Sequence, residues 1–253
     1  MISRVRTALT ALAVLSCSTL AAGSASAEES VSPRYARSYV SPQYFAMELR
    51  FSPYRPQIDD EPALNGKTPY ANTFGSMRRL MVQLELDWQA FRIPYVGTIG
   101  PGLGVGYTNM SDKSFTQTGG RSDEDTSLDI FPMYLAAVLR ADTFYRNAGI
   151  PIVPYAKAGL GMGIWRATNP GGTSDANGVR GEGKSLGLHG AIGISFALDA
   201  LDPSAALQLD NATGINHTYV FVDYYVAALN GLAQSSALRV GTNSWAAGLA
   251  FEF

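Results

Sequence analysis

Hydrophobic and polar residues alternate along much of this chain, and the alternation is clearest at its C-terminal end. From Trp245 to Phe253 the sequence reads Trp-Ala-Ala-Gly-Leu-Ala-Phe-Glu-Phe. Because successive side chains of a β-strand point to opposite faces, Trp245, Leu249 and Phe253 share one face, while Gly248 and Glu252 share the other. A strand that is apolar on one face and small or acidic on the other fits between lipid and water. The segment therefore predicts the closing strand of a transmembrane β-barrel.

Seven further segments repeat this period of two. With the last one, they cover residues 44–51, 80–89, 96–107, 128–140, 152–165, 185–198, 215–228 and 238–253. A tilted strand crosses a bilayer with about 9–11 residues, and bacterial single-chain barrels use an even number of strands. In segment 128–140 we expect a β-bulge at Pro132 that switches the alternation, because proline cannot donate to a strand ladder.

The residues on the face that we place inwards distinguish a membrane barrel from a soluble one. Glycine concentrates there, as the narrow interior of an eight-stranded barrel requires. The charged residues that interrupt the strands share this face and carry both signs: Glu48, Arg50, Glu85, Asp87, Lys157, Asp223 and Glu252. A soluble barrel or sandwich, the alternative, would turn its charges outwards. We therefore predict an all-β fold, an eight-stranded antiparallel up-and-down transmembrane β-barrel with a short periplasmic helix.

Connection lengths agree with the long outer loops and short periplasmic turns of such barrels. The first, third and fifth connections are long, the seventh is shorter, the second is tight and the fourth is moderate. The sixth, 199–214, is long for a periplasmic turn. Its Asp202-Pro203 pair predicts a short helix with an aspartate N-cap and proline at the first position, which we place at the periplasmic mouth.

The N-terminus has the features of a secretory signal peptide. Arg4 and Arg6 precede an apolar run, and a small-residue cleavage site ends at Ala27. Lipidation at Cys17 is the alternative, since residues 14–17 loosely resemble a lipoprotein box. We therefore expect a signal peptide over 1–27, a flexible segment over 28–43 and the barrel over 44–253.

Composition after this cleavage narrows the protein classes. The remaining chain has no cysteine, so disulfides are excluded. Loss of two arginines leaves 17 basic against 21 acidic residues, a net charge near −4, and no basic patch indicates nucleic acid. No apolar stretch of 18 residues follows the signal, which excludes a transmembrane helix. We expect a protein of the bacterial outer membrane.

Aromatic residues near strand ends fit the girdles that outer-membrane barrels place at the two lipid–water interfaces. Ordinary β-propensity is the alternative explanation for each residue taken singly. The candidates for the girdle are Trp88, Trp165, Trp245 and Phe253.

Gly248 and Phe251 before the terminal Phe253 look like the C-terminal assembly signal of outer-membrane proteins, although Ala246 stands where a polar residue is usual. In size and strand layout the chain resembles the small outer-membrane barrels of the OmpA, OmpX and OmpW kind. Residues 51–59, 85–89 and 150–157 resemble, more narrowly, a myxobacterial-type family of predicted outer-membrane barrels. The resemblance implies outer-membrane lipid, lipopolysaccharide and the barrel-assembly machinery as partners. It implies no activity.

The inward charges carry the strongest chemical signal. Glu85 and Asp87 share a face, with Arg50, Lys157 and Asp223 as candidates to meet them across the barrel. Charges in a low-dielectric interior must be paired, so a structural salt-bridge network is expected. The alternative is a gate in a narrow channel or hydrophobic-solute conduit.

Catalytic chemistry has little basis in the sequence. His189 and Ser195 lie six residues apart on one face, roughly 20 Å at strand rise, which is too far for a hydrogen bond. His217 is expected at the rim, and no Gly-x-Ser-x-Gly turn occurs. We assign no catalytic residue and no cofactor, and keep a lipid-modifying enzyme as the third alternative.

The acidic loop runs 59–61 and 123–125 are expected to be solvated. Bridging to lipopolysaccharide phosphates by divalent cations is the alternative, but neither run has EF-hand spacing, so no metal site is assigned. The favoured function is therefore a non-enzymatic structural or interaction role through long outer loops, whose partner the sequence does not identify.

Overall fold

The computed structural model describes residues 43–115, 121–176, 178–232 and 237–253. The expected signal peptide, its cleavage site after Ala27, Cys17 and residues 28–42 lie outside the described residues. Eight long strands build the barrel: β1 (Phe45–Tyr54), β2 (Arg79–Trp88), β4 (Gly97–Phe115), β5 (Arg121–Arg140), β6 (Ile152–Asn169), β10 (Glu182–Ala197), β11 (His217–Ala228) and β12 (Thr242–Glu252).

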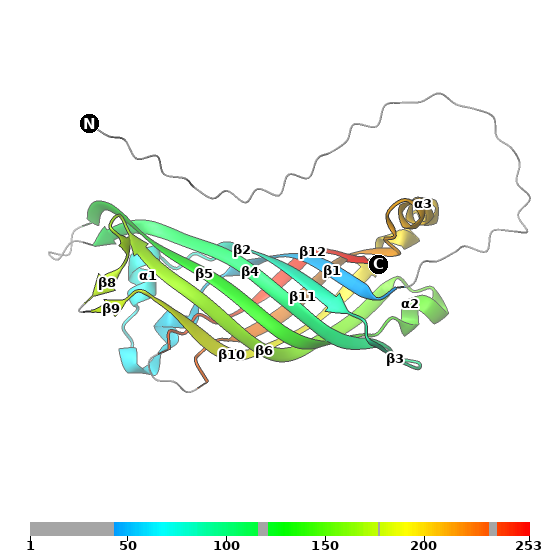
Figure 1. The fold of residues 1–253 in the computed structure, drawn as a ribbon, viewed down its shortest axis with the longest axis horizontal. Helices are drawn as coiled ribbons and strands as arrows, with labels where there is room; N and C mark the ends of the chain where they lie inside the picture. The colour runs from blue at the N-terminus through cyan, green and yellow to red at the C-terminus, as the bar shows by residue number, and fades with distance from the viewer. Residues whose placement is uncertain (1–42, 116–120, 177, 233–236) are drawn as a thin grey trace, which may run out of the picture. The chain divides into compact units, whose positions relative to one another are not determined.

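These strands form one closed antiparallel sheet (Figure 1). Each of the eight strands pairs with the next of the eight along the chain, as β6 does with β10. The last strand, β12, pairs with β1 and closes the barrel. Between β12 and β1 the register sets Phe51 opposite Ala247 and Glu48 opposite Ala250. The predicted eight-stranded up-and-down barrel is therefore confirmed.

Short elements cover both ends of the barrel (Figure 1). One end, called the α1 end below, carries η1 (Gln57–Asp60), η2 (Pro62–Leu64), α1 (Pro69–Phe74), β7 (Gly172–Thr173), β8 (Asp175–Ala176) and β9 (Val179–Arg180). The other, called the α3 end, carries β3 (Phe91–Ile93), α2 (Thr143–Ala148), η3 (Leu198–Ala200) and α3 (Pro203–Thr213). Within the described part of the chain, no helix is long and apolar enough to cross a membrane.

The predicted helix after β10 is present as α3. The Asp202 carboxylate accepts hydrogen bonds from the backbone N–H groups of Ser204 at 3.1 Å and Ala205 at 3.0 Å. The Ser204 hydroxyl also donates a hydrogen bond to this carboxylate. This hydroxyl bond first, and then the backbone bonds, lower the pKa of Asp202. Gly214 ends the helix in the left-handed conformation, at φ 74°, where glycine lacks the Cβ clash of other residues.

The bulge expected at Pro132 is absent, and this prediction was wrong. Ile130, Tyr134 and Arg140 are all buried, so β5 alternates without a switch. The β4–β5 register also stays constant on both sides of Pro132, which itself has no partner in that ladder. Pro132 stays paired with Gly163 of β6, so β5 passes this gap in the β4 ladder without a bulge.

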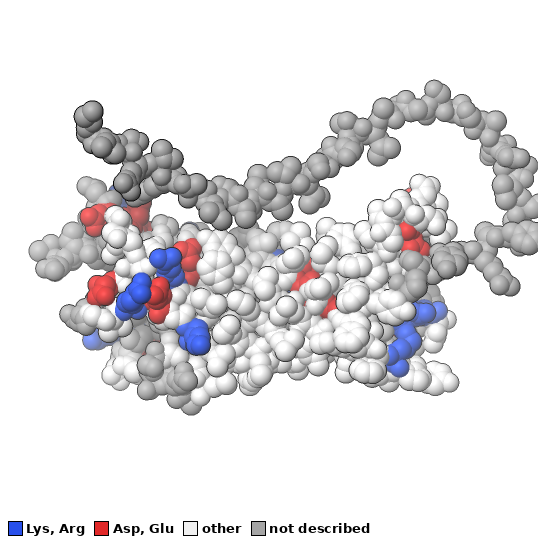
Figure 2. Space-filling model, viewed as in Figure 1, with Lys and Arg blue, Asp and Glu red and all other residues white. Residues whose placement is uncertain are grey.

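The outer wall of the barrel is apolar, as predicted. Along β2, Leu84 and Leu86 are about half exposed, whereas Glu85 and Asp87, which alternate with them, are buried. Figure 2 shows most charged groups of this face near the two ends, with a mostly uncharged middle. A soluble monomer rarely exposes a continuous apolar surface of this extent, and strands that face lipid require one.

Substitution of an outward-facing leucine by arginine tests whether the outer wall faces lipid or water. Leu84, midway along β2, is 47 % exposed. If it faces the bilayer midplane, Leu84→Arg should lower the free energy of unfolding in lipid vesicles by about 2–4 kcal/mol. Leu201→Arg, outside the strands on an exposed residue, is the matched control and should change it little. Equal, small effects would mean that the outer wall meets water.

Candidate functional site

Six of the predicted inward charges meet in one buried network inside the barrel. Each of them is at most 3 % exposed. The register explains part of this: Glu48 lies opposite Glu85 across β1 and β2, and Lys157 reaches both from β6. These six are Glu48, Arg50, Glu85, Asp87, Lys157 and Asp223, and Arg140 joins them in the network.

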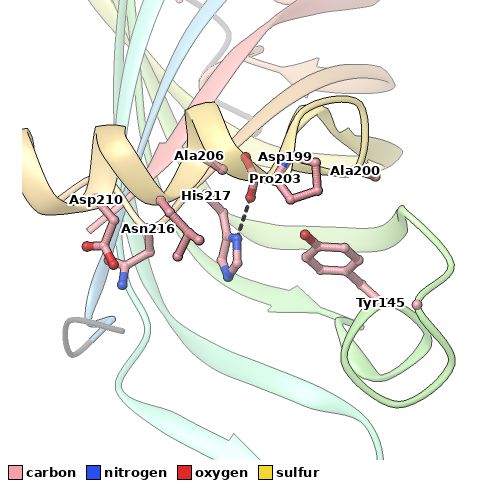
Figure 3. Close-up of a pocket in the computed structure, with 10 residues that line it drawn as sticks. Tyr145, Asp199, Ala200, Pro203, Ala206, Asp210, Asn216 and His217 are labelled. Atoms are coloured by element: carbon pink, nitrogen blue, oxygen red, sulfur yellow. Dashed lines mark hydrogen bonds and ion pairs between the residues drawn. The ribbon is translucent and has the colours of Figure 1, made fainter. Parts of the chain in front are cut away.

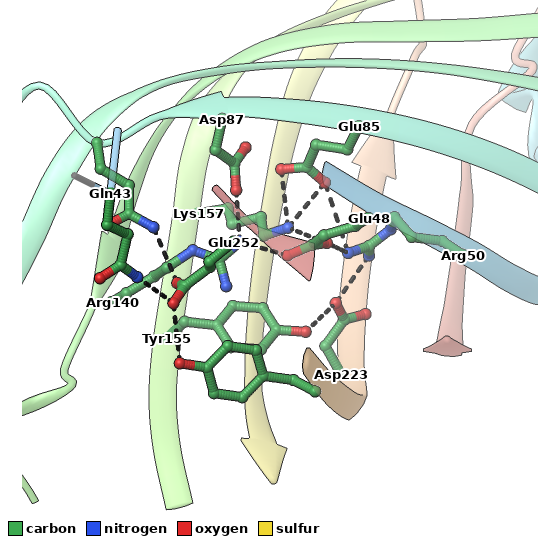
Figure 4. Close-up of polar contacts among 12 residues, drawn as sticks. Gln43, Glu48, Arg50, Glu85, Asp87, Arg140, Tyr155, Lys157, Asp223 and Glu252 are labelled. Atoms are coloured by element: carbon green, nitrogen blue, oxygen red, sulfur yellow. Dashed lines mark hydrogen bonds and ion pairs between the residues drawn. The ribbon is translucent and has the colours of Figure 1, made fainter. Parts of the chain in front are cut away.

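Glu48 is the centre of this network (Figure 4). Its carboxylate lies 2.7 Å from Arg50 Nη1 and 2.7 Å from Lys157 Nζ, and 2.5 Å from Arg140 Nη2. One carboxylate thus joins cations from β1, β6 and β5. Such short, charge-assisted contacts are stronger than hydrogen bonds between neutral groups.

Each of the three cations also contacts a second acid. Arg50 lies 2.7 Å from Asp223. Lys157 lies 2.7 Å from Glu85. Arg140 lies 2.5 Å from Asp87. No cation of the trio therefore depends on a single partner, as burial of charge in a low-dielectric interior requires.

Tyrosines supply further donors to the acids, which outnumber the cations in this network. Tyr134 donates to Glu85 at 2.5 Å, and Tyr155 donates to Asp223 at 2.7 Å. The Tyr134 ring has room because it lies over Gly104 of β4, where a Cβ would overlap the ring. Packing of the Tyr134 ring thus explains the glycine at position 104.

Glu252 is buried but lies apart from the other six, near the α3 end. It accepts hydrogen bonds from Gln89 at 2.8 Å, from Tyr219 at 2.9 Å and from Gln43. These contacts join the end of β12 to β11 and to the residues flanking β1 and β2. We therefore group Glu252 with the strand junction rather than with the network around Glu48.

Sequence reasoning missed Arg140 and Tyr134. Both lie on β5, where the expected bulge obscured the inward face. Unbroken alternation through Pro132 places both residues inwards with Ile130. The tyrosine partners on β6 and β11, Tyr155 and Tyr219, likewise lie on inward positions of their strands.

An apolar cluster fills the barrel between the network and the α1 end. Residues from the connections contribute to it, among them Ile58 of η1 and Tyr70 of α1, whose hydroxyl contacts Met110 Sδ at 3.0 Å. Together with strand residues they close this end. Further members of the cluster include Tyr54, Met81, Leu128, Ile130, Leu229 and Val240.

Three of the four candidate girdle residues are exposed on the outer wall: Trp88, Trp245 and Phe253. Phe253 stacks on Phe45 with ring centroids 6.2 Å apart. Trp165 is different: it is half-buried and packs against the inner apolar cluster. The expected outer position of Trp165 is therefore corrected, and the cause is its place in the alternation of β6, in phase with inward-facing Gly161 and Gly163. Gly248 faces inwards and Phe251 outwards, and their assembly role stays a prediction.

In the acidic loop run 59–61, two side chains have partners within the protein. Asp59 accepts from the backbone N–H groups of Tyr70 at 2.8 Å and Ala71 at 3.0 Å, so it holds the start of α1. Glu61 pairs with Arg239 at 2.8 Å. Two of the three residues in the 59–61 run are thus engaged within the protein, contrary to the expected solvated loop. In the second run, Glu124 and Asp125 are exposed, and the Asp123 side chain lies outside the described residues.

Carboxylate oxygens of Glu48, Glu85 and Asp87 lie within 4.8 Å of one another, a spacing that metal ligands can have. Lys157 and two arginines already contact these same oxygens. The protein's own cations therefore occupy the positions that a metal ion would need. The His189 ring stacks on the Tyr134 ring, with 3.8 Å between the ring centroids. His189 therefore packs in the barrel interior.

No protein-family model matches the chain, and no curated protein matches it. Several solved structures of outer-membrane barrels resemble it. The outer membrane protein OprG of Pseudomonas aeruginosa has 14% identity and a TM-score of 0.45, covering 85% of this chain and 98% of that one. Neisserial surface protein A has 15% identity and a TM-score of 0.40, covering 83% and 97%.

The attachment invasion locus protein Ail of Yersinia pestis has 11% identity and a TM-score of 0.39, covering 83% of this chain and 97% of that one. None of these comparisons supports the narrower resemblance to a myxobacterial-type family. Because the identities and scores are low, the barrel assignment here rests on strand register and burial.

Removing one cation should reveal how much the network contributes to stability. Lys157→Met leaves Glu48 and Glu85 buried with one partner fewer, and should lower the free energy of unfolding by about 3–5 kcal/mol. Urea unfolding in lipid vesicles measures it. Adding Glu85→Gln should restore part of the loss, and Lys67→Met on an exposed loop residue is the control. A loss no larger than the control's would contradict a stabilising network.

Proposed function

We propose that the protein is a closed scaffold of the bacterial outer membrane that makes its contacts through the segments at the α1 end. The observation that carries this proposal is the filled interior: an apolar cluster at the α1 end lies above a buried ion network. An eight-stranded barrel has little open space once side chains fill it. A conducting path would have to separate ion pairs of 2.5 to 2.7 Å.

The apolar outer wall supports a membrane location. In that setting the partners of the wall are outer-membrane lipid and lipopolysaccharide, and Gly248, Phe251 and Phe253 serve as the signal for the barrel-assembly machinery. The predicted export signal over 1–27 agrees with this route. The proposal assigns no reaction to the protein, since His189 is enclosed by aromatic rings and His217 is paired with Asp199.

Interaction is assigned to the α1 end because the longer connections gather there. They carry exposed charges of both signs, including Lys67, Arg78, Asp175 and Arg180, and Figure 2 shows blue and red groups side by side at this end. A polar, mixed-charge surface on a rigid barrel suits contacts with envelope or external partners. We place this end outside the cell and the α3 end in the periplasm.

Electrical recording tests whether the scaffold is closed. The refolded 28–253 chain in a planar bilayer should show no reproducible conductance step, because an apolar cluster and buried ion pairs fill the interior formed by the described strands. Heat-modifiable gel migration serves as the folding control. A reproducible step that disappears in Lys157→Ala would contradict the proposal and favour the channel alternative.

Cysteine labelling tests the orientation. The chain after cleavage at Ala27 has no cysteine, so Lys67→Cys and Gln208→Cys each introduce a single thiol at an exposed residue. In intact cells a membrane-impermeant maleimide should label Lys67→Cys at the α1 end. Gln208→Cys on α3 should react only after the outer membrane is permeabilised. The reverse pattern would place the α3 end outside.

A further inference from the structure

A separate cavity of about 520 Å³ opens at the α3 end (Figure 3). It lies between α2, η3, α3 and the start of β11. Its volume falls within the roughly 300–1,000 Å³ of small-ligand sites. The cavity is separate from the network around Glu48, and the scaffold role proposed above does not use it.

One wall of the cavity is apolar. It consists of Ala200 of η3 and of Pro203, Ala206 and Leu207 on α3. Leu207 is 47 % exposed although it is a large hydrophobic residue. Covering such a wall with methylene groups of a ligand is favourable, because it removes apolar surface from water.

Two carboxylates also line the cavity, on the same elements as the apolar wall: Asp199 on η3 and Asp210 on α3. Asp199 lies 2.5 Å from His217 Nδ1, and its other oxygen accepts the Thr218 N–H at 3.1 Å. Asp210, near the end of α3, also lines the cavity and is 9 % exposed. Figure 3 shows these two acids on either side of His217.

An aromatic ring completes the lining. Tyr145 of α2 faces His217 edge-on, with ring centroids 5.5 Å apart. Burial, and then the neighbouring carboxylates Asp199 and Glu252, raise the pKa of the Tyr145 hydroxyl. The tyrosine is therefore neutral at physiological pH, and its ring face attracts cations.

Acids outnumber basic groups around the cavity, and one of the basic groups, His217, is paired with Asp199. Asp199 and Asp210 line it, and Glu252 acts on both Tyr145 and His217. The nearby Arg146 side chain is about half exposed and lies 3.8 Å from Asp142. A ligand that enters meets two acids, an aromatic ring and alkyl groups.

We propose that this cavity binds an alkylammonium group of the lysine side-chain type. The ammonium lies near Asp199 and Asp210 beside the Tyr145 ring, and the methylene chain lies on the wall of Ala206 and Leu207. An ammonium group can donate charge-assisted hydrogen bonds to these carboxylates, which an anionic or purely apolar ligand cannot do. The partner is therefore a lysine-bearing chain presented at the α3 end.

Ligand titration by NMR tests the proposal on the full barrel in lipid nanodiscs. The probe is Nα-acetyl-lysine amide, and Nα-acetyl-norleucine amide is the control with the same alkyl chain but no ammonium group. The amide signals of Gly149 and Asn216, both in the lining, should shift to saturation with the lysine compound only.

Variants locate the binding. Asp210→Asn keeps the shape and should weaken binding about tenfold, the loss expected for one charge-assisted hydrogen bond. Ala206→Phe should abolish binding because the ring fills the cavity. Asp175→Asn, which removes the same charge at the α1 end, should leave binding unchanged. Heat-modifiable migration confirms that each variant is folded.

The proposal is overturned by any of three results. These are the absence of saturable shifts, equal saturation by the norleucine compound, and binding that both Asp210→Asn and Ala206→Phe leave intact. Failure here leaves the scaffold proposal unaffected, because conductance and labelling report on other parts of the barrel.

Discussion

Charge pairing around Glu48 is the constraint on which the barrel interior depends. A carboxylate in a low-dielectric interior is stable only with partners, and Glu48 finds three cations within 2.7 Å. Two of these cations come from the neighbouring strands β5 and β6, and the third comes from β1, which is far from both in the sequence but meets them across the closed barrel. Each then binds a second acid, so the network fixes how strands on opposite sides of the barrel stand relative to one another.

The remaining interior is arranged around this network. Glycines on β4 and β6 leave room for large side chains from across the barrel, as Gly104 does for Tyr134 and Gly161 does for Leu229. The α1 end is closed by residues of the connections as well as of the strands, because Asp59 holds the start of α1 and α1 brings Tyr70 into the apolar cluster. The same connections therefore close the barrel and form the surface to which we assign interaction.

Alternation along the chain predicted most of the fold, because it depends only on the period of a strand and on which face meets lipid. It placed the eight strands and most of the inward charges, whereas the Asp202-Pro203 pair predicted α3. Alternation could not predict the contacts across the barrel. Lys157 meets Glu48 because the sheet closes and its strands tilt, and a local sequence pattern contains no information on either. Arg140 was missed through an expected bulge, and Trp165 was misplaced because its nearness to a strand end was weighed above its phase. The cavity beside α3 likewise depends on how separate connections pack.

Hydroxyl-radical oxidation of the native methionines in lipid vesicles tests the central claim, an apolar wall in lipid around a sealed interior. Met77 is exposed on a connection, Met47 faces outwards from β1, and Met81 and Met110 are buried inside. Radicals formed in water should oxidise Met77 and spare the other three. Oxidation of Met47 at the rate of Met77 would mean that the outer wall meets water, and oxidation of Met81 or Met110 in the folded barrel would mean that water fills the interior.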